Sequence, residues 1–96
     1  MKAFITLAAL LAVTQPAMAQ SFNCRHADTR TEEAICDNPQ LRALDRRMSW
    51  AYARALRSGD TSTREQRRWL ASRDACGGSD GCIRAAYVQR LRELRQ

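Results

Sequence analysis

The chain has 96 residues and a formal net charge of +6 at pH 7. This length allows one small domain, whose core alone would hardly hold it together, and it leaves no room for a large catalytic pocket. The positive charge fits either a solvated arginine-rich surface or an anionic partner such as lipid headgroups, cell-wall polymer or an acidic protein. No nucleic-acid-binding motif is present, so nucleic acid is not an expected partner.

Residues 1–19 have the plan of a secretory signal peptide. Lys2 gives a positive start, residues 3–13 are apolar, and Ala17-Met18-Ala19 fits a cleavage site. An apolar run of 11 residues is too short to span a bilayer, and no later stretch approaches that length. The alternative to a signal peptide is that residues 1–19 form a buried N-terminal helix of the folded domain. We expect a periplasmic or secreted product of residues 20–96 that is not an integral membrane protein. No cysteine lies at the cleavage point, so lipid attachment there is not expected.

The four cysteines, Cys24, Cys36, Cys76 and Cys82, predict two disulfides in an oxidising compartment. Three pairings are possible. We favour the two local pairs, because a helix of about six residues spans only about 9 Å and the loop at 77–81 is rich in glycine. A zinc site is the alternative, but its paired ligands usually lie about two to four residues apart. Here the gaps are eleven and five residues, so no metal or cofactor is expected.

Capping residues mark the first two expected helices. Thr29 and Glu32 fit a capping box that opens a short helix ending at Cys36. Asn38 is suited to cap a second helix at 39–57, whose apolar residues recur at spacings of three and four. Gly59 is suited to end that helix in the left-handed conformation.

A second capping box, Ser62 to Glu65, opens a third helix that reaches about Cys76. A loop at 77–81 and a last helix at 82–94 complete the chain, and no segment alternates like a strand. The sequence thus predicts an all-α fold, a small antiparallel bundle of three main helices plus one short N-terminal helix. Its expected core is Ile35, Leu41, Leu44, Met48, Tyr52, Trp69, Leu70, Ile83, Tyr87, Leu91 and Leu94.

Four blocks of residues carry a resemblance to a known family. They are Phe22-x-Cys24 with Thr29-x-x-Glu32-x-Ala34-Ile35-Cys36; Leu41-x-x-Leu44-Asp45-x-x-Met48-x-x-x-Tyr52; Gln66-Arg67-x-Trp69-Leu70-x-x-Arg73-Asp74-x-Cys76; and Cys82-Ile83-x-x-x-Tyr87-x-x-Arg90-Leu91-x-x-Leu94. In this order the chain resembles the LprI-like lysozyme inhibitor N-terminal domain family across nearly all of residues 20–96. The resemblance implies an exported binding module that inhibits lysozyme by protein–protein contact.

The polar residues of that pattern, Asp45, Arg73 and Asp74, are interpreted as an ion pair between helices that fixes their register, with a recognition site as the alternative. The only histidine, His26, has no partner for a catalytic triad, so no enzymatic activity is expected.

Two surfaces are candidates for partner binding. Animal lysozymes are basic, so a lysozyme contact would need a local acidic patch, for which Glu32, Glu33 and Asp37 are candidates. The alternative function is a basic cell-envelope binding protein that docks on anionic polymer or lipid. Its candidate surface is the helix face that bears Arg64, Arg67 and Arg68.

Overall fold

The computed structural model describes residues 20–95, and the expected signal peptide at residues 1–19 lies outside the described residues. The described chain folds into the α-helices α1 (Arg30–Asp37), α2 (Pro39–Ser58), α3 (Thr63–Asp74) and α4 (Asp80–Leu94), preceded by a 3-10 helix, η2 (Cys24–His26). It has no strand within residues 20–95. The all-helical class and the two disulfides agree with the sequence prediction, whereas η2 was not predicted.

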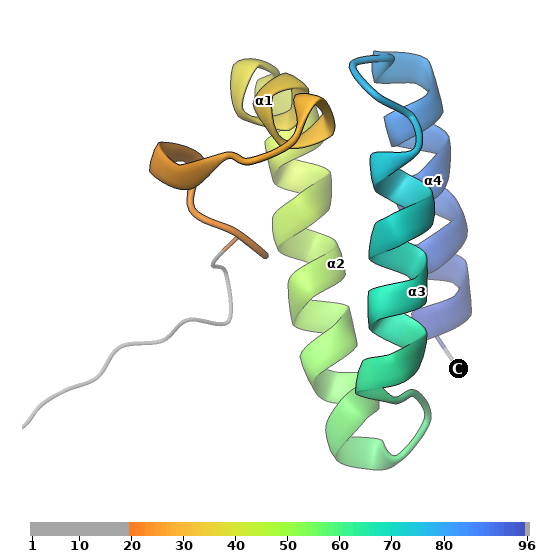
Figure 1. Cartoon of the computed structure of the whole chain (residues 1–96). Coiled ribbons are helices and arrows are strands. Elements are labelled where there is room, and N and C mark those ends of the chain that lie inside the picture. Colours follow the sequence, from red (N-terminus) through yellow and green to blue (C-terminus); the bar gives the residue numbers. More distant parts are fainter. Residues whose placement is uncertain (1–19, 96) are drawn as a thin grey trace, which may run out of the picture.

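The three long helices lie side by side, and α1 crosses the end at which α2 begins (Figure 1). The direction of α3 is opposite to that of α2 and α4 (Figure 1). Helix α4 packs against both α2 and α3, and α1 contacts all three long helices. The two loops that join α2 to α3 and α3 to α4 therefore lie at opposite ends of the molecule.

Polar side chains cap each helix at its first turn. Thr29 accepts a hydrogen bond from the Glu32 N–H, and Ser62 accepts one from the Glu65 N–H. These bonds satisfy donors that have no partner inside the helix. Neither glutamate completes its capping box: Glu32 accepts from the N–H of Asp28, and Glu65 accepts from the hydroxyl of Thr61.

The turn between α3 and α4 is where the predicted boundaries were wrong. Helix α3 ends at Asp74, and α4 begins at Asp80 instead of Cys82. The cause is Ser79, whose side chain accepts from the Cys82 N–H and so starts the helix before the cysteine. The predicted left-handed end of α2 is present, since Gly59 has φ 78°.

The core combines apolar side chains with an unusual share of polar ones. Of the predicted core residues, Ile35, Leu41, Met48, Trp69, Ile83, Tyr87 and Leu94 are buried. Leu44, Tyr52, Leu70 and Leu91 are only partly buried and pack against the edge of that core. In so small a domain, each helix has residues at the margin of its apolar stripe that the neighbouring helices do not cover. Five polar residues are buried as well: Thr31, Asp45, Gln66, Arg73 and Arg90.

Candidate functional site

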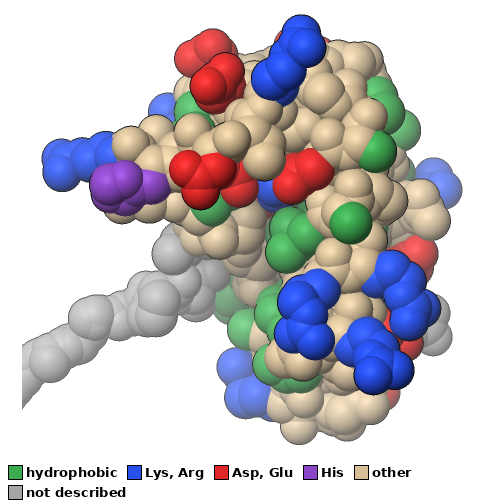
Figure 2. Space-filling model, in the orientation of Figure 1, with side chains coloured by type: hydrophobic (Ala, Val, Ile, Leu, Met, Phe, Trp, Pro, Cys, Tyr) green, Lys and Arg blue, Asp and Glu red, His purple; other side chains and the backbone are tan. Residues whose placement is uncertain are grey.

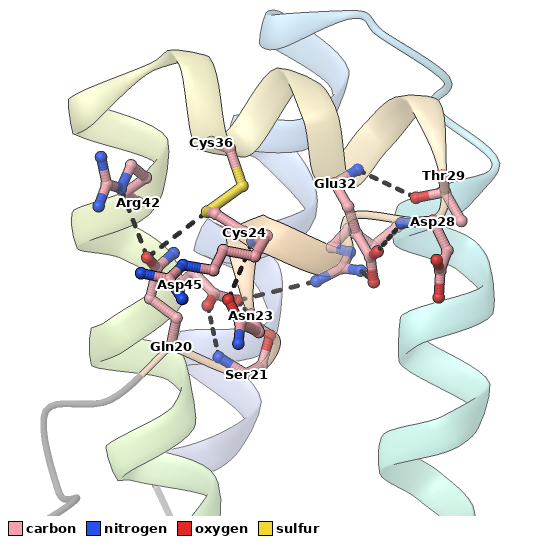
Figure 3. The surroundings of a disulfide bond; sticks show 12 residues. Gln20, Ser21, Asn23, Cys24, Asp28, Thr29, Glu32, Cys36, Arg42 and Asp45 are labelled. Carbon is pink, nitrogen blue, oxygen red and sulfur yellow. Dashed lines mark hydrogen bonds and ion pairs between the residues drawn. A yellow bond between two sulfur atoms is a disulfide. The ribbon is translucent and has the colours of Figure 1, made fainter.

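Asp45 is the centre of a polar network between α2, α3 and α4. Its carboxylate is fully buried and accepts three hydrogen bonds, from the Ser21 N–H, the Ser21 hydroxyl and the Tyr87 hydroxyl, each at 2.7 Å. The Arg73 guanidinium lies 3.7 Å from the same carboxylate. The contact between Asp45 and Arg73 that the sequence motif predicted is therefore present. Figure 3 shows Ser21 and Asp45 facing each other below the first disulfide.

Arg73 is also almost fully buried, and acidic groups surround it. Its Nε and Nη2 donate to Asp74 Oδ1 at 3.0 and 2.9 Å, and its Nη1 donates to the Tyr87 hydroxyl at 3.2 Å. Glu32 lies 3.6 Å away. The rings of Phe22 and Trp69 lie within cation–π distance of the guanidinium, at 5.6 and 5.8 Å. Several partners thus share one buried positive charge.

The Tyr87 hydroxyl lies between the acid and the base. It donates to Asp45 and accepts from Arg73. Burial raises the pKa of Tyr87 well above its ordinary value, and the charge of Asp45 raises that pKa further. The hydroxyl therefore stays protonated and remains a donor to Asp45. The polar groups of this network therefore satisfy one another and connect α2, α3 and α4.

A second buried network joins α3 to the end of α4. Gln66 Oε1 accepts from Arg90 Nε and Nη2 at 3.1 and 2.9 Å, and Arg90 also donates to Thr61 and Glu93. Neither Gln66 nor Arg90 was assigned a role from the sequence. The helical spacing from buried residues could have revealed that both side chains are buried. Gln66 lies three residues before buried Trp69, and Arg90 lies three residues after buried Tyr87, so each shares a buried helix face.

The predicted acidic cluster is divided between an inward and an outward group. Glu32 is the inward one: its side chain is 16% exposed, lies against Arg73 and accepts from the backbone of Asp28. Glu33 and Asp37 are exposed on α1. Asp28 and Asp80 are exposed nearby, and Asp80 accepts a hydrogen bond from Asn38. We call Asp28, Glu33, Asp37 and Asp80 the acidic end. Figure 2 shows acidic side chains gathered over this part of the molecule.

The predicted arginine face is exposed on α3. Arg64, Arg67 and Arg68 are all exposed, and none of them forms an ion pair with an acid of residues 20–95. In Figure 2, a group of basic side chains lies on the lower half of the molecule, and most acidic side chains lie on the upper half, together with further basic ones. The structure therefore separates the two candidate binding surfaces along the long axis of the helices.

The disulfides join Cys24 to Cys36 and Cys76 to Cys82, with Cα–Cα distances of 5.8 and 5.6 Å. These are the local pairs that the spacing favoured. Both lie at the α1 end of the molecule, and the first ties the segment that carries Ser21 to α1 (Figure 3). Thr31 of α1 in turn donates to the backbone carbonyls of Asp74 and Gly77, beside the second disulfide.

Residues 20–95 contain neither a metal-binding cluster nor a helix that could span a membrane. No cluster of three or more histidine, cysteine or acidic side chains suited to a metal ion occurs among them. Likewise, none of the helices in this part of the chain has the length and apolar character needed to cross a membrane.

Among known proteins, the chain is similar to Lipoprotein LprI of Mycobacterium tuberculosis and of Mycobacterium bovis. The identity is 35% over 86 residues, which cover 84% of this chain and 44% of each relative. The chain thus spans less than half the length of these relatives. This similarity supports an LprI-like relationship, in agreement with the resemblance carried by the motifs. No protein-family model matches the chain, and no solved structure matches it.

Proposed function

We propose that this chain is an exported, non-enzymatic binding module that contacts a protein partner, with lysozyme as the first candidate. The observation that carries the proposal is the similarity to Lipoprotein LprI over most of the chain. The family that the motifs resemble takes its name from lysozyme inhibition, which supplies the candidate partner. Two disulfides in a domain of this size are typical of exported proteins, and the relatives are named lipoproteins.

The acidic end is the surface that best suits a basic partner. Glu33 and Asp37 are four residues apart on α1, so they share one exposed helix face. Glu32 contributes to this surface indirectly, because its contact with Arg73 holds α1 against α3. The disulfide between Cys24 and Cys36 braces the same helix, so the surface is rigid before the partner arrives.

A binding role without catalysis is supported by the way the polar residues are used. The most deeply buried carboxylate, Asp45, is saturated by internal donors, and Arg73 and Tyr87 are directed at each other and at Asp45. His26, the only histidine, is exposed on η2. These groups lack the pairing of a base with an accessible nucleophile that hydrolysis requires.

The test is the clearing of a peptidoglycan suspension by a c-type lysozyme in the presence of a molar excess of the oxidised protein. We expect clearing to slow. Because the whole protein is basic, association should be slow at low salt and faster as salt screens the net repulsion. Undiminished clearing at every salt concentration, together with no heat of binding in calorimetry, would contradict the proposal.

A pair of matched variants locates the contact. Glu33→Gln with Asp37→Asn removes two charges from the acidic end, and Asp60→Asn with Glu65→Gln removes two exposed charges from the opposite end. We expect the first variant to lose inhibition at least tenfold and the second to keep it. Equal losses would show that overall charge, and not the acidic end, determines binding.

The arginine face of α3 supports a second candidate function, docking on an anionic envelope component, because its three arginines are exposed and form no ion pair with the acids of residues 20–95. Envelope binding that falls steeply with salt, while lysozyme activity is untouched, would favour this candidate.

A further inference from the structure

Trp50 is the largest exposed apolar side chain for which neither the fold nor the proposed function has a use. It is 42% exposed on α2, away from the buried core. The Arg54 guanidinium lies over its ring at 4.8 Å from the centroid, which is cation–π geometry. Trp50 and Arg54 therefore place an apolar ring and a positive charge side by side at the surface.

Trp50 lines a groove between α2 and α4 with a volume of about 310 Å³. Leu91 and Leu94 of α4 contribute the other large apolar side chains, and Arg47, Arg54 and Arg95 contribute the charge. All three arginines are exposed, whereas Leu94 is buried and Leu91 partly so. The groove therefore has an apolar floor and a cationic rim. Val88, three residues before Leu91 and 38% exposed, extends its apolar side along α4.

No acidic side chain lines this groove. Within residues 20–95, the ion pairs involve Arg73 and Arg90 and leave the three rim arginines without an acid. A second copy of the chain is a poor occupant, because two such rims would bring like charges together. A basic partner such as lysozyme is excluded from this surface for the same reason. The occupant must be anionic and must accept an apolar anchor.

We propose that the α2–α4 groove docks the protein on an anionic lipid bilayer. Tryptophan and arginine are the side chains that favour the headgroup level, the first with its amphipathic ring and the second with its long apolar stem. Shallow insertion of Trp50 and Val88 combined with attraction of several arginines to anionic lipid is the recognised pairing for reversible surface binding. An acidic protein fits less well, since Trp50 and Val88 are the only exposed large apolar side chains that residues 20–95 place at this groove, and the dry centre of a stable protein interface needs more.

This inference does not rest on the proposed function. The groove is formed by α2 and α4, whereas Glu33 and Asp37 of the acidic end lie on α1. A membrane-bound molecule would therefore have the acidic end free for a partner.

The test is co-sedimentation of the oxidised protein, recovered from an exporting host, with vesicles of phosphatidylglycerol and phosphatidylcholine. Every purified variant must begin at the same residue as the wild-type protein, and mass spectrometry establishes this. We expect binding to the anionic vesicles at low salt and little to the zwitterionic ones. Substituting Arg47→Gln, Arg54→Gln and Arg95→Gln together should weaken binding about 100-fold, since each basic residue near the surface contributes about fivefold.

The matched control removes the same charge from α3 through Arg64→Gln, Arg67→Gln and Arg68→Gln. We expect it to weaken binding less than tenfold, through the general field alone. An equal or larger effect of the α3 variant would overturn the proposal, as would failure of the wild-type protein to bind anionic vesicles. Binding to an acidic peptide but not to the vesicles would overturn it in favour of a protein partner.

A second readout reports on insertion itself. Brominated lipid should quench the emission of the wild-type protein, and Trp50→Phe, which leaves buried Trp69 as the only tryptophan, should abolish that quenching. If the bound wild-type protein is not quenched, or if Trp50→Phe is quenched to the same extent, Trp50 is not the inserted side chain and the proposed docking is overturned.

Discussion

Asp45 illustrates how one residue can organise a core that has few apolar side chains. A buried carboxylate is costly unless donors replace the water that it loses. Here three hydrogen bonds and one nearby guanidinium do so, and they come from the N-terminal segment, α4 and α3. Since Asp45 itself belongs to α2, a single side chain links four parts of the chain.

Asp45→Ala should destabilise the protein by about 3–5 kcal/mol, because it leaves Arg73 buried with one fewer counter-charge and removes the acceptor of Ser21 and Tyr87. Urea unfolding followed by circular dichroism measures the change. The control is Asp60→Ala, an exposed aspartate for which we expect a change within about 0.5 kcal/mol. Equal effects of the two substitutions would contradict the structural role assigned to Asp45.

The two tryptophans should behave oppositely on truncation. Trp69 is 7% exposed, packs on Tyr87 and donates its indole N–H to the Ala86 carbonyl at 3.1 Å. Trp69→Ala should therefore cost about 3–5 kcal/mol. Trp50→Ala, at an exposed site, should cost less than about 1 kcal/mol. Thermal unfolding of both variants tests this. A stable Trp69→Ala protein would move Trp69 from the core to a binding surface.

The sequence allowed part of the buried network to be predicted at the level of residues. Asp45 and Arg73 could be paired because both belong to a motif and lie on predicted neighbouring helices. Gln66 and Arg90 were overlooked, because long polar side chains on a helix are usually solvated. Only the packing of α3 against α4 shows that these two residues satisfy each other inside the protein.

At the scale of elements, helix starts were easier to predict than the turn between α3 and α4. Thr29, Asn38 and Ser62 each accept hydrogen bonds from the first turn that follows, as their local sequences predicted. The segment 77–81 has three glycines and was predicted to be a loop throughout. Ser79 nevertheless caps α4, and Gly81 lies inside the helix, because the disulfide and the contacts of Thr31 fix this turn.

The two disulfides should contribute unequally to stability. They close loops with sequence separations of 12 and 6, for which loop entropy predicts about 3 and about 2 kcal/mol. Replacing both Cys24 and Cys36 by serine also frees the segment that carries Ser21, so that variant should lose more stability than the one lacking Cys76 and Cys82. Urea unfolding compares the two variants.

Peptide mapping under non-reducing conditions must first establish the two pairs in the purified protein. The reverse order of stability loss, or a peptide joining Cys24 or Cys36 to Cys76 or Cys82, would contradict this account.

At the scale of the whole molecule, the exposed charges are unevenly distributed. The acidic end lies at α1 and at the start of α4, where exposed Arg25, Arg30 and Arg42 nearly balance its charge. Along the rest of α2, α3 and the end of α4, exposed arginines outnumber exposed acids. Such an arrangement makes the α1 end the part of the surface that repels a basic partner least.

Global stability should be insensitive to the titration of Tyr87 until the solution becomes alkaline. The ordinary pKa of tyrosine is 10.0, and burial together with Asp45 raises the pKa of Tyr87 in the folded state. Above about pH 10 the unfolded chain loses this proton while the folded chain keeps it, so stability falls as pH rises. We expect a slope of about 1.4 kcal/mol per pH unit from this residue.

Urea unfolding between about pH 9 and 11 measures that slope. Tyr87→Phe removes the titrating group, so its stability, although lower, should lack this part of the alkaline slope. An unchanged slope in Tyr87→Phe would show that other groups cause the loss.

Because the cysteines pair locally, neither disulfide would hold the chain together after cleavage of the backbone between the two pairs. The Cys24–Cys36 disulfide precedes the loop between α2 and α3 in the sequence, and the Cys76–Cys82 disulfide follows it. Within residues 20–95, the backbone of that exposed loop around Gly59 is therefore the only covalent connection between the two parts. Cleavage there would yield two separate fragments, each with its own disulfide. The packing of α4 on α2 and the bond from Tyr87 to Asp45 would then be intermolecular, so complementation between the fragments would depend on their concentration.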